Sequence, residues 1–171
     1  ETSMLGAWSI FANPADTVTI REGVASYGAN ALFASGCSVL DPQTSIMGMS
    51  ELYQNAKTQT DLDELLGEAV DTALRADKVV LCIGEHAAQS GEAASRGDIT
   101  IPECQKKLLR EVARVNKNLV VVLFNGRPLD IREIKSLAKA ILVVWMPGTE
   151  GGNAITEVLY GKTSPSGKLP M

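Results

Sequence analysis

Three continuous apolar runs constrain the fold more than any other feature of the sequence. They read KVVLCI at 78–83, LVVVLF at 119–124 and AILVVW at 140–145. A strand with one wet face alternates apolar and polar residues, whereas a continuous apolar run is typical of a parallel strand covered on both faces. Helical patterns separate the runs. The sequence therefore predicts an α/β fold, a three-layer sandwich with a mostly parallel sheet and helices on both faces.

The regions around these runs carry the signals of helices and turns. Asp16 is the candidate N-cap of a helix over 17–27, and a short buried strand is expected at 31–34. Residues 37–60 carry mixed signals and are interpreted as a loop with room for one short turn of helix. Further helices are expected at 61–75, 103–115, 130–137 and 153–160.

Composition and motifs exclude several classes of function. The net charge is −4 with no basic run, and no apolar stretch approaches the roughly 20 residues of a membrane span, so neither nucleic acid nor a membrane is an expected partner. The loop after 78–83 lacks GxGxxG, and Gly161-Lys-Thr163 lacks the upstream glycine of a P-loop because Thr156 stands there. The single histidine, His86, cannot build a triad or a multi-histidine metal site, and a local hydrogen bond is favoured for it over direct contact with a ligand. No cofactor and no metal are expected.

The cysteines indicate no particular chemistry from the sequence alone. Cys37, Cys82 and Cys104 are far apart and form no CxxC pair, which argues against structural zinc. Free buried thiols are the favoured interpretation, with Cys82 inside an apolar strand. An odd count leaves at most one disulfide, and the sequence alone does not assign it.

The long polar loop at 84–102 is the candidate site, because loops at the carboxyl ends of parallel strands carry the chemistry of many α/β proteins. It holds the carboxylates Glu85, Glu92 and Asp98, with Arg96 among them. One interpretation is that Arg96 and Asp98 pair and only hold the loop. The other is that one carboxylic acid protonates a leaving group. Composition leaves both open.

Longer motifs in the chain resemble a known family. Residues 90–102 read SGEAASRGDITIP, and further motifs are LFNGRPL at 123–129, WMPGTEGGNA at 145–154 and PSGKLP at 165–170. In this order and at this spacing they resemble the C-terminal α/β-sandwich domain of glycoside hydrolase family 3, most of all its bacterial periplasmic β-glucosidases. The resemblance spans nearly all of residues 1–171.

The resemblance implies roles for particular residues. Glu92, in SGEAASR, matches the general acid/base of the family. Trp8 matches an aromatic wall at the leaving-group subsite, with plain core packing as the alternative. Arg96 and Asp98 complete the expected substrate-binding set, mainly by shaping the loop, and Glu85 is expected to anchor the loop through backbone amides.

The resemblance also implies a second domain. In the family a preceding (β/α)8 barrel binds most of the sugar and supplies the nucleophilic aspartate, so the expected partners are that barrel in the same polypeptide and an oligosaccharide or β-glucoside. The chain is then expected to be a fragment that lacks the barrel and the first strand of the sheet, and to be inactive alone. The expected function is that of the second domain of a retaining exo-β-glycosidase, periplasmic or secreted. The alternative is a non-catalytic carbohydrate-binding or interaction module of the same fold.

Overall fold

The fold is a three-layer sandwich, seen in a computed structural model that describes residues 4–28, 30–41, 44 and 59–170. Three parallel strands form one sheet in the order β1-β2-β3. These strands are β1 (Val79–Gly84), β2 (Leu119–Phe124) and β3 (Ala140–Val143). The α/β class and the parallel sheet expected from the apolar runs are confirmed. The loop expected at 37–60 lies mostly outside the described residues.

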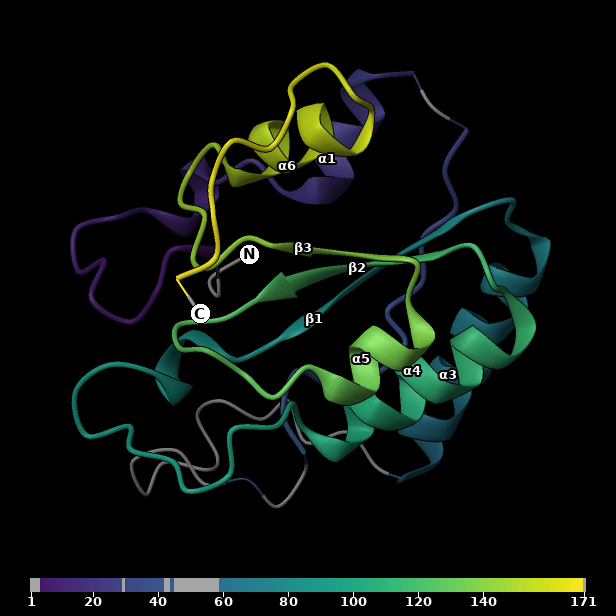
Figure 1. Ribbon diagram of the computed structural model, residues 1–171, viewed down its shortest axis with the longest axis horizontal. Coiled ribbons are helices and arrows are strands. Elements are labelled where there is room, and N and C mark those ends of the chain that lie inside the picture. Colours follow the sequence, from purple (N-terminus) through teal and green to yellow (C-terminus); the bar gives the residue numbers. More distant parts are fainter. Residues whose placement is uncertain (1–3, 29, 42–43, 45–58, 171) are drawn as a thin grey trace.

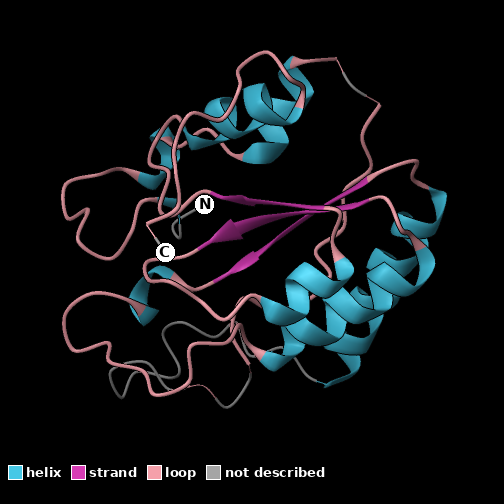
Figure 2. Ribbon diagram, in the orientation of Figure 1, coloured by secondary structure: helices cyan, strands magenta, loops and turns pink. Residues whose placement is uncertain are grey.

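Helices cover the two faces of the sheet unequally (Figure 1). One face carries α3 (Gln59–Arg75), α4 (Glu103–Val115) and α5 (Arg132–Leu137). The other carries α1 (Ile20–Ser26) and α6 (Gly151–Leu159). Figure 2 shows the strands between these two helical layers.

The main core lies between the sheet and the α3–α4–α5 layer. Leu109 of α4 and Leu119 and Val121 of β2 are fully buried there, and Leu81 and Ile83 of β1 face the same cluster. Apolar side chains at helical spacing on α4 therefore meet the inward side chains of two strands. Burial of this kind contributes about 1.5–3 kcal/mol for each large apolar side chain.

The opposite face of the sheet is thinly covered, which corrects the expectation that all three strands are buried on both sides. Val80 is 44% exposed and Cys82 is exposed, whereas Val122 of β2 is buried. The expected strand at 140–145 is shorter, and none of its four β3 residues is buried. The physical reason is that α1 and α6 pack chiefly against each other.

The expected strand at 31–34 is also wrong. No ladder includes these residues in the part of the chain that the structure describes. Ala34 packs against the core, but Leu32 and Phe33 are exposed, and the Phe33 ring lies 4.5 Å below the Arg21 guanidinium carbon. Apolar composition favours burial, but a strand also needs a neighbour to which its backbone can bond.

The first helix begins later than predicted. Asp16 is not its N-cap but the last residue of a short 3-10 helix over Pro14–Asp16, which Asn13 caps. The α1 helix begins at Ile20, and Thr19 and Glu22 form a reciprocal capping box. A capping box satisfies two backbone donors and therefore outcompetes the single carboxylate of Asp16.

Candidate active site

The site lies at the carboxyl ends of the strands, where the loops after β1, β2 and β3 meet. Gly84 ends β1 with φ +146°, and a Cβ built there would lie 1.8 Å from the Phe124 carbonyl oxygen. Only glycine allows the two strand ends to approach this closely. The Glu85 amide then donates to the same carbonyl at 2.8 Å, which directs the Glu85 side chain toward the end of β2.

Gln105 of α4 fixes the start of the loop. Its Oε1 accepts from the Gly84 amide at 2.7 Å, and its Nε2 donates to the Gly84 carbonyl at 2.9 Å and to the Val39 carbonyl at 2.6 Å. A buried amide side chain thus satisfies the backbone groups that β1 leaves unpaired at its end. The helix that follows the loop thereby positions the strand that precedes it.

Glu85 is the centre of a buried ion-pair network. Its side chain has no exposed area, and Oε1 lies 2.7 Å from Nη1 of Arg96 and 3.0 Å from Nε of Arg127. Oε2 accepts from the Gly126 amide at 3.0 Å. The backbone anchor expected for Glu85 is therefore present, and two arginines are added to it. A carboxylate held this way is committed to structure and is not open to a substrate.

The two arginines clamp the loop from different sides. Arg96 Nη2 donates to the Thr100 carbonyl at 2.8 Å. Arg127 Nη2 donates to the carbonyls of Gln89 and Ala94, the latter at 2.6 Å. One guanidinium from the loop after β2 therefore binds both arms of the loop after β1.

Arg96 and Asp98 do not form the ion pair that the sequence left open. Asp98 instead accepts from the Thr100 amide at 2.8 Å, and the Thr100 amide and hydroxyl together lower the pKa of the Asp98 carboxyl. This turn shapes the base of the loop. A substrate-binding role for Arg96 or Asp98 stays a prediction.

Glu92 stands apart from the other two carboxylates. It lies in a turn closed by the Ala94 amide donating to the Gly91 carbonyl at 3.3 Å, with Gly91 at φ +108° and Ala93 at φ +56°. Its side chain is exposed, and within the described residues no hydrogen bond or ion pair engages its carboxylate. Positive φ at a non-glycine residue such as Ala93 costs energy and is often retained at functional sites.

Trp8 lies beside this turn. A Cβ at Gly91 would be 3.4 Å from the Trp8 Nε1, and the Trp8 side chain is 63% exposed. Core packing, the alternative for Trp8, is therefore wrong. The structure brings Trp8 and the Glu92 turn together from segments that are far apart in the sequence.

An open groove of about 510 Å³ runs between the Trp8 segment and the loops after β1 and β2. It is lined by Leu5, Gly6, Ala7, Trp8, Ser9, Ser90, Gly91, Gly126 and Met146. The sequence reasoning did not assign Ser90, Gly126 or Met146 to the site, although the motifs SGEAASR, NGRP and WMPG contained them. Trp145 next to Met146 has φ +53°, so the loop after β3 turns sharply at the groove.

His86 has the local hydrogen bond expected of it. Its Nδ1 accepts from the Ala88 amide at 3.2 Å and caps the short 3-10 helix Ala87–Gln89, and burial lowers its pKa. Across the described ranges no group of three His, Cys, Asp or Glu side chains is placed to hold a metal ion.

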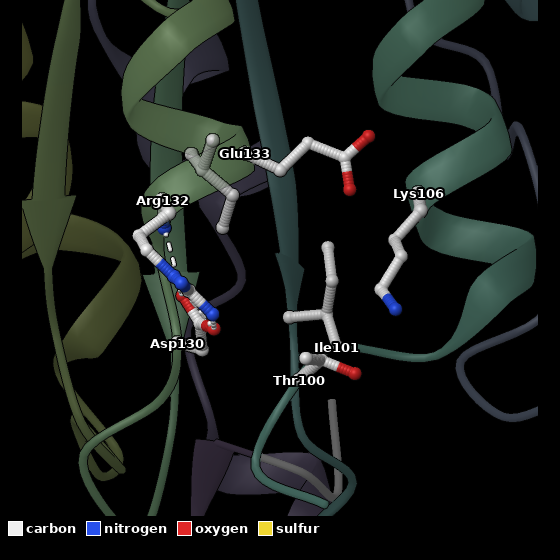
Figure 3. Close-up of a pocket in the computed structure, with 7 residues that line it drawn as sticks. Thr100, Ile101, Lys106, Asp130, Arg132 and Glu133 are labelled. Carbon is white, nitrogen blue, oxygen red and sulfur yellow. Dashed lines mark hydrogen bonds and ion pairs between the residues drawn. The ribbon is translucent and has the colours of Figure 1, made fainter.

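A second depression, of about 300 Å³, lies between α4 and α5 (Figure 3) and shares no lining residue with the groove. Its charged residues are paired: Asp130 with Arg132 at 2.5 Å, Glu133 with Arg110 at 2.5 Å, and Lys106 with Glu103 at 3.5 Å. Such pairing is typical of a solvated protein surface, so this depression is not the candidate site.

The fold and the groove define a class of protein: an α/β domain that presents one uncommitted carboxylate beside an exposed aromatic side chain. Comparison with known sequences then gives the family. Residues 1–171 match the profile described as the glycosyl hydrolase family 3 C-terminal domain. The chain belongs to this family, as its C-terminal domain.

Relatives and solved structures agree with this assignment. The periplasmic beta-glucosidase of Salmonella typhimurium is 38% identical over 176 aligned residues, which cover 100% of this chain and 23% of that protein. The GH3 beta-glucosidase of Bifidobacterium adolescentis has a TM-score of 0.75 at 35% identity, with 91% of this chain and 21% of that one covered. The beta-glucosidase of Listeria innocua in complex with isofagomine has a TM-score of 0.80 at 28% identity, with 99% and 21% covered. The chain thus spans 21–23% of the length of these relatives.

Within the described ranges, every helix is too short or too polar to cross a bilayer.

Proposed function

We propose that this chain supplies the general acid/base of a retaining exo-β-glycosidase of the β-glucosidase type, and that Glu92 is the group that carries the proton. The observation behind the proposal is the contrast among the three loop carboxylates. Glu85 is buried between two arginines and Asp98 is held by Thr100, whereas the Glu92 carboxylate is exposed beside the Trp8 groove. Only Glu92 has room for a glycosidic oxygen.

The reaction needs two carboxyl groups about 5–5.5 Å apart across the scissile bond. One attacks the anomeric carbon as the Glu92 carboxyl gives its proton to the departing oxygen, and a glycosyl ester forms. The Glu92 carboxylate then takes a proton from water, which attacks the anomeric carbon and releases the sugar with retained configuration. Trp8 would stack on the leaving group in the groove, because an aromatic face suits the apolar face of a sugar ring.

The other carboxylates of the described loop do not offer the second carboxyl group on the opposite side of the sugar. Glu85 and Asp98 lie on the same loop as Glu92 and are committed to Arg96, Arg127 and Thr100. We therefore propose that another domain of the same polypeptide, a (β/α)8 barrel, contributes an aspartate nucleophile and binds most of the sugar. The coverage of the relatives supports this, since the chain spans less than a quarter of each.

A general acid of this kind keeps its proton near neutral pH only in a site closed from water. Because Glu92 is exposed here, the barrel would provide that closure. The name of the Salmonella typhimurium relative further supports a periplasmic or secreted location for the parent protein and a β-glucoside as its substrate.

The purified 171-residue chain is therefore expected not to hydrolyse an aryl β-glucoside, since the nucleophile is proposed to come from another domain. Release of the aryl group is measured by absorbance, with Glu92→Ala and the exposed α3 variant Glu68→Ala as matched controls. Turnover that Glu92→Ala abolishes and Glu68→Ala leaves intact would show that the chain holds a complete site and would overturn the two-domain account.

A further inference from the structure

Residues 35–41 run along the start of α4, and four contacts hold them there. The Asp41 carboxylate accepts from the amides of Glu103 and Cys104 at 2.8 and 2.7 Å. The Cys104 Sγ donates to the Ser38 carbonyl at 3.3 Å, and Gln105 donates to the Val39 carbonyl at 2.6 Å. These contacts fix the register between the helix and the residues that follow Cys37.

Close packing on the other side of Cys37 fixes its position as well. Gly36 has φ +77°, and a Cβ built there would lie 2.6 Å from a methyl carbon of Leu108, one helical turn beyond Cys104. Gly36 therefore lies directly on the surface of α4. Cys37 follows Gly36 and precedes Ser38, whose carbonyl accepts from the Cys104 thiol, so both of its neighbours in the chain contact α4.

The thiols of Cys37 and Cys104 are in hydrogen-bond contact with each other. This contact, burial and the Asp41 carboxylate all raise the pKa of the Cys104 thiol. Both side chains are half-buried, so a small reagent can reach them, whereas Cys82 is exposed on β1. Of the three cysteines, only these two face each other within the described residues.

We propose that Cys37 and Cys104 form a disulfide site that closes by exchange with a small-molecule disulfide such as oxidised glutathione. One cysteine thiolate attacks a sulfur of the reagent, forms a mixed disulfide and releases the first small thiol. The other cysteine thiolate then attacks the protein-side sulfur, forms the Cys37–Cys104 bond and releases the second thiol. The protein loses two hydrogen atoms, and the reagent is reduced to two thiols. Oxidising compartments outside the cytosol supply such reagents.

The disulfide bond would stabilise the start of the loop after β1, which lines the groove. Cys104 precedes Gln105, whose amide group holds both backbone atoms of Gly84 at the point where the loop begins. Oxidation would therefore tie residues 35–41, α4 and the end of β1 into one unit. This inference does not depend on the role of Glu92.

The test uses the purified chain, treated with oxidised glutathione at mildly alkaline pH and then alkylated. The number of titratable thiols should fall from three to one, and the intact mass measured before alkylation should fall by 2 Da. Trypsin should release peptide 22–57 joined to peptide 97–106, while peptide 79–96 carries Cys82 in alkylated form. The oxidised chain should also melt about 5–15 °C higher than the reduced one, and dithiothreitol should reverse the rise.

Single serine variants sharpen the test. Cys82→Ser should go from two thiols to none with the same joined peptides, and Cys104→Ser should form no intramolecular bond. Three thiols that stay titratable in the wild-type chain, or a bond that includes peptide 79–96, would overturn the proposal. The peptide map of the wild-type chain shows whether Cys37 and Cys104 are joined even where a variant folds poorly.

Discussion

At the scale of single residues, the chemistry of the site follows from what each carboxylate already binds. The sequence presents Glu85, Glu92 and Asp98 as three carboxylates of equal standing, and only the SGEAASR motif singles out Glu92. The structure adds the physical reasons for the difference: Thr100 holds Asp98, and Arg96 and Arg127 hold Glu85. Arg127 comes from the loop after β2 and reaches the loop after β1, so no local pattern in the sequence could indicate its contact.

Arg127→Ala should destabilise the chain by about 3–5 kcal/mol, because it removes one partner of a buried carboxylate and leaves Gln89 and Ala94 carbonyls without a donor. Urea unfolding measures the change. Arg132→Ala is the matched control: it breaks an ion pair on an exposed side chain and should cost less than about 1 kcal/mol. Equal effects of the two substitutions would mean that the Glu85 network does not hold the fold.

Asp98 should titrate below its usual pKa of 3.8, because the Thr100 amide and hydroxyl stabilise its charged form. A group with a lowered pKa in the folded state adds stability above its unfolded pKa and loses it as pH falls through the folded value. The turn at Asp98 should therefore persist above about pH 4 and weaken only in stronger acid. Carbon-detected NMR of the carboxyl group gives the midpoint, and a value at or above 3.8 would contradict the hydrogen bonds seen here.

At the scale of elements, a helix or strand predicted from the sequence matches the structure where several sequence signals indicate the same element. The β2 strand and α4 have the bounds expected for them, because a continuous apolar run and a long apolar stripe leave little freedom. The expected strand at 31–34 fails because its apolar residues find no ladder within the described chain. The Asp16 cap fails because Thr19 and Glu22 offer a better one three residues later.

Gly84→Ala tests the end of β1, which sets the direction of the loop that follows it. A Cβ there would meet the Phe124 carbonyl at 1.8 Å with φ +146°, so the ends of β1 and β2 must separate. We expect a loss of about 3 kcal/mol or more from overpacking and backbone strain together. Gly67→Ala on α3 is a control that should raise the free energy of unfolding instead. Nothing lies within 4 Å of its added Cβ, and alanine should stabilise the helix by about 0.5–1 kcal/mol relative to glycine. Thermal unfolding of both variants measures the two stability changes. A Gly84→Ala chain as stable as the wild type would contradict the close approach of the strands.

At the scale of the whole molecule, the chain folds as one sandwich and carries one side of a proposed two-sided site. The sheet and α4 hold the loop, the loops after β2 and β3 complete the groove, and the exposed Glu92 follows Gly91, which lines it. The family and the fold follow from the sequence because the motifs are long. The identity of the sugar does not, because most contacts to it are proposed to come from another domain.

The most direct test compares two substrates in the full-length protein that contains this chain. Glu92→Ala should lower kcat/KM for a natural β-linked disaccharide by about 10²–10⁴-fold, because its leaving group needs a proton. It should lower kcat/KM far less for a dinitrophenyl β-glucoside, whose leaving group departs without one, and Glu68→Ala should change neither. Equal losses on both substrates, or no loss on either, would contradict the assignment of Glu92 as the general acid/base.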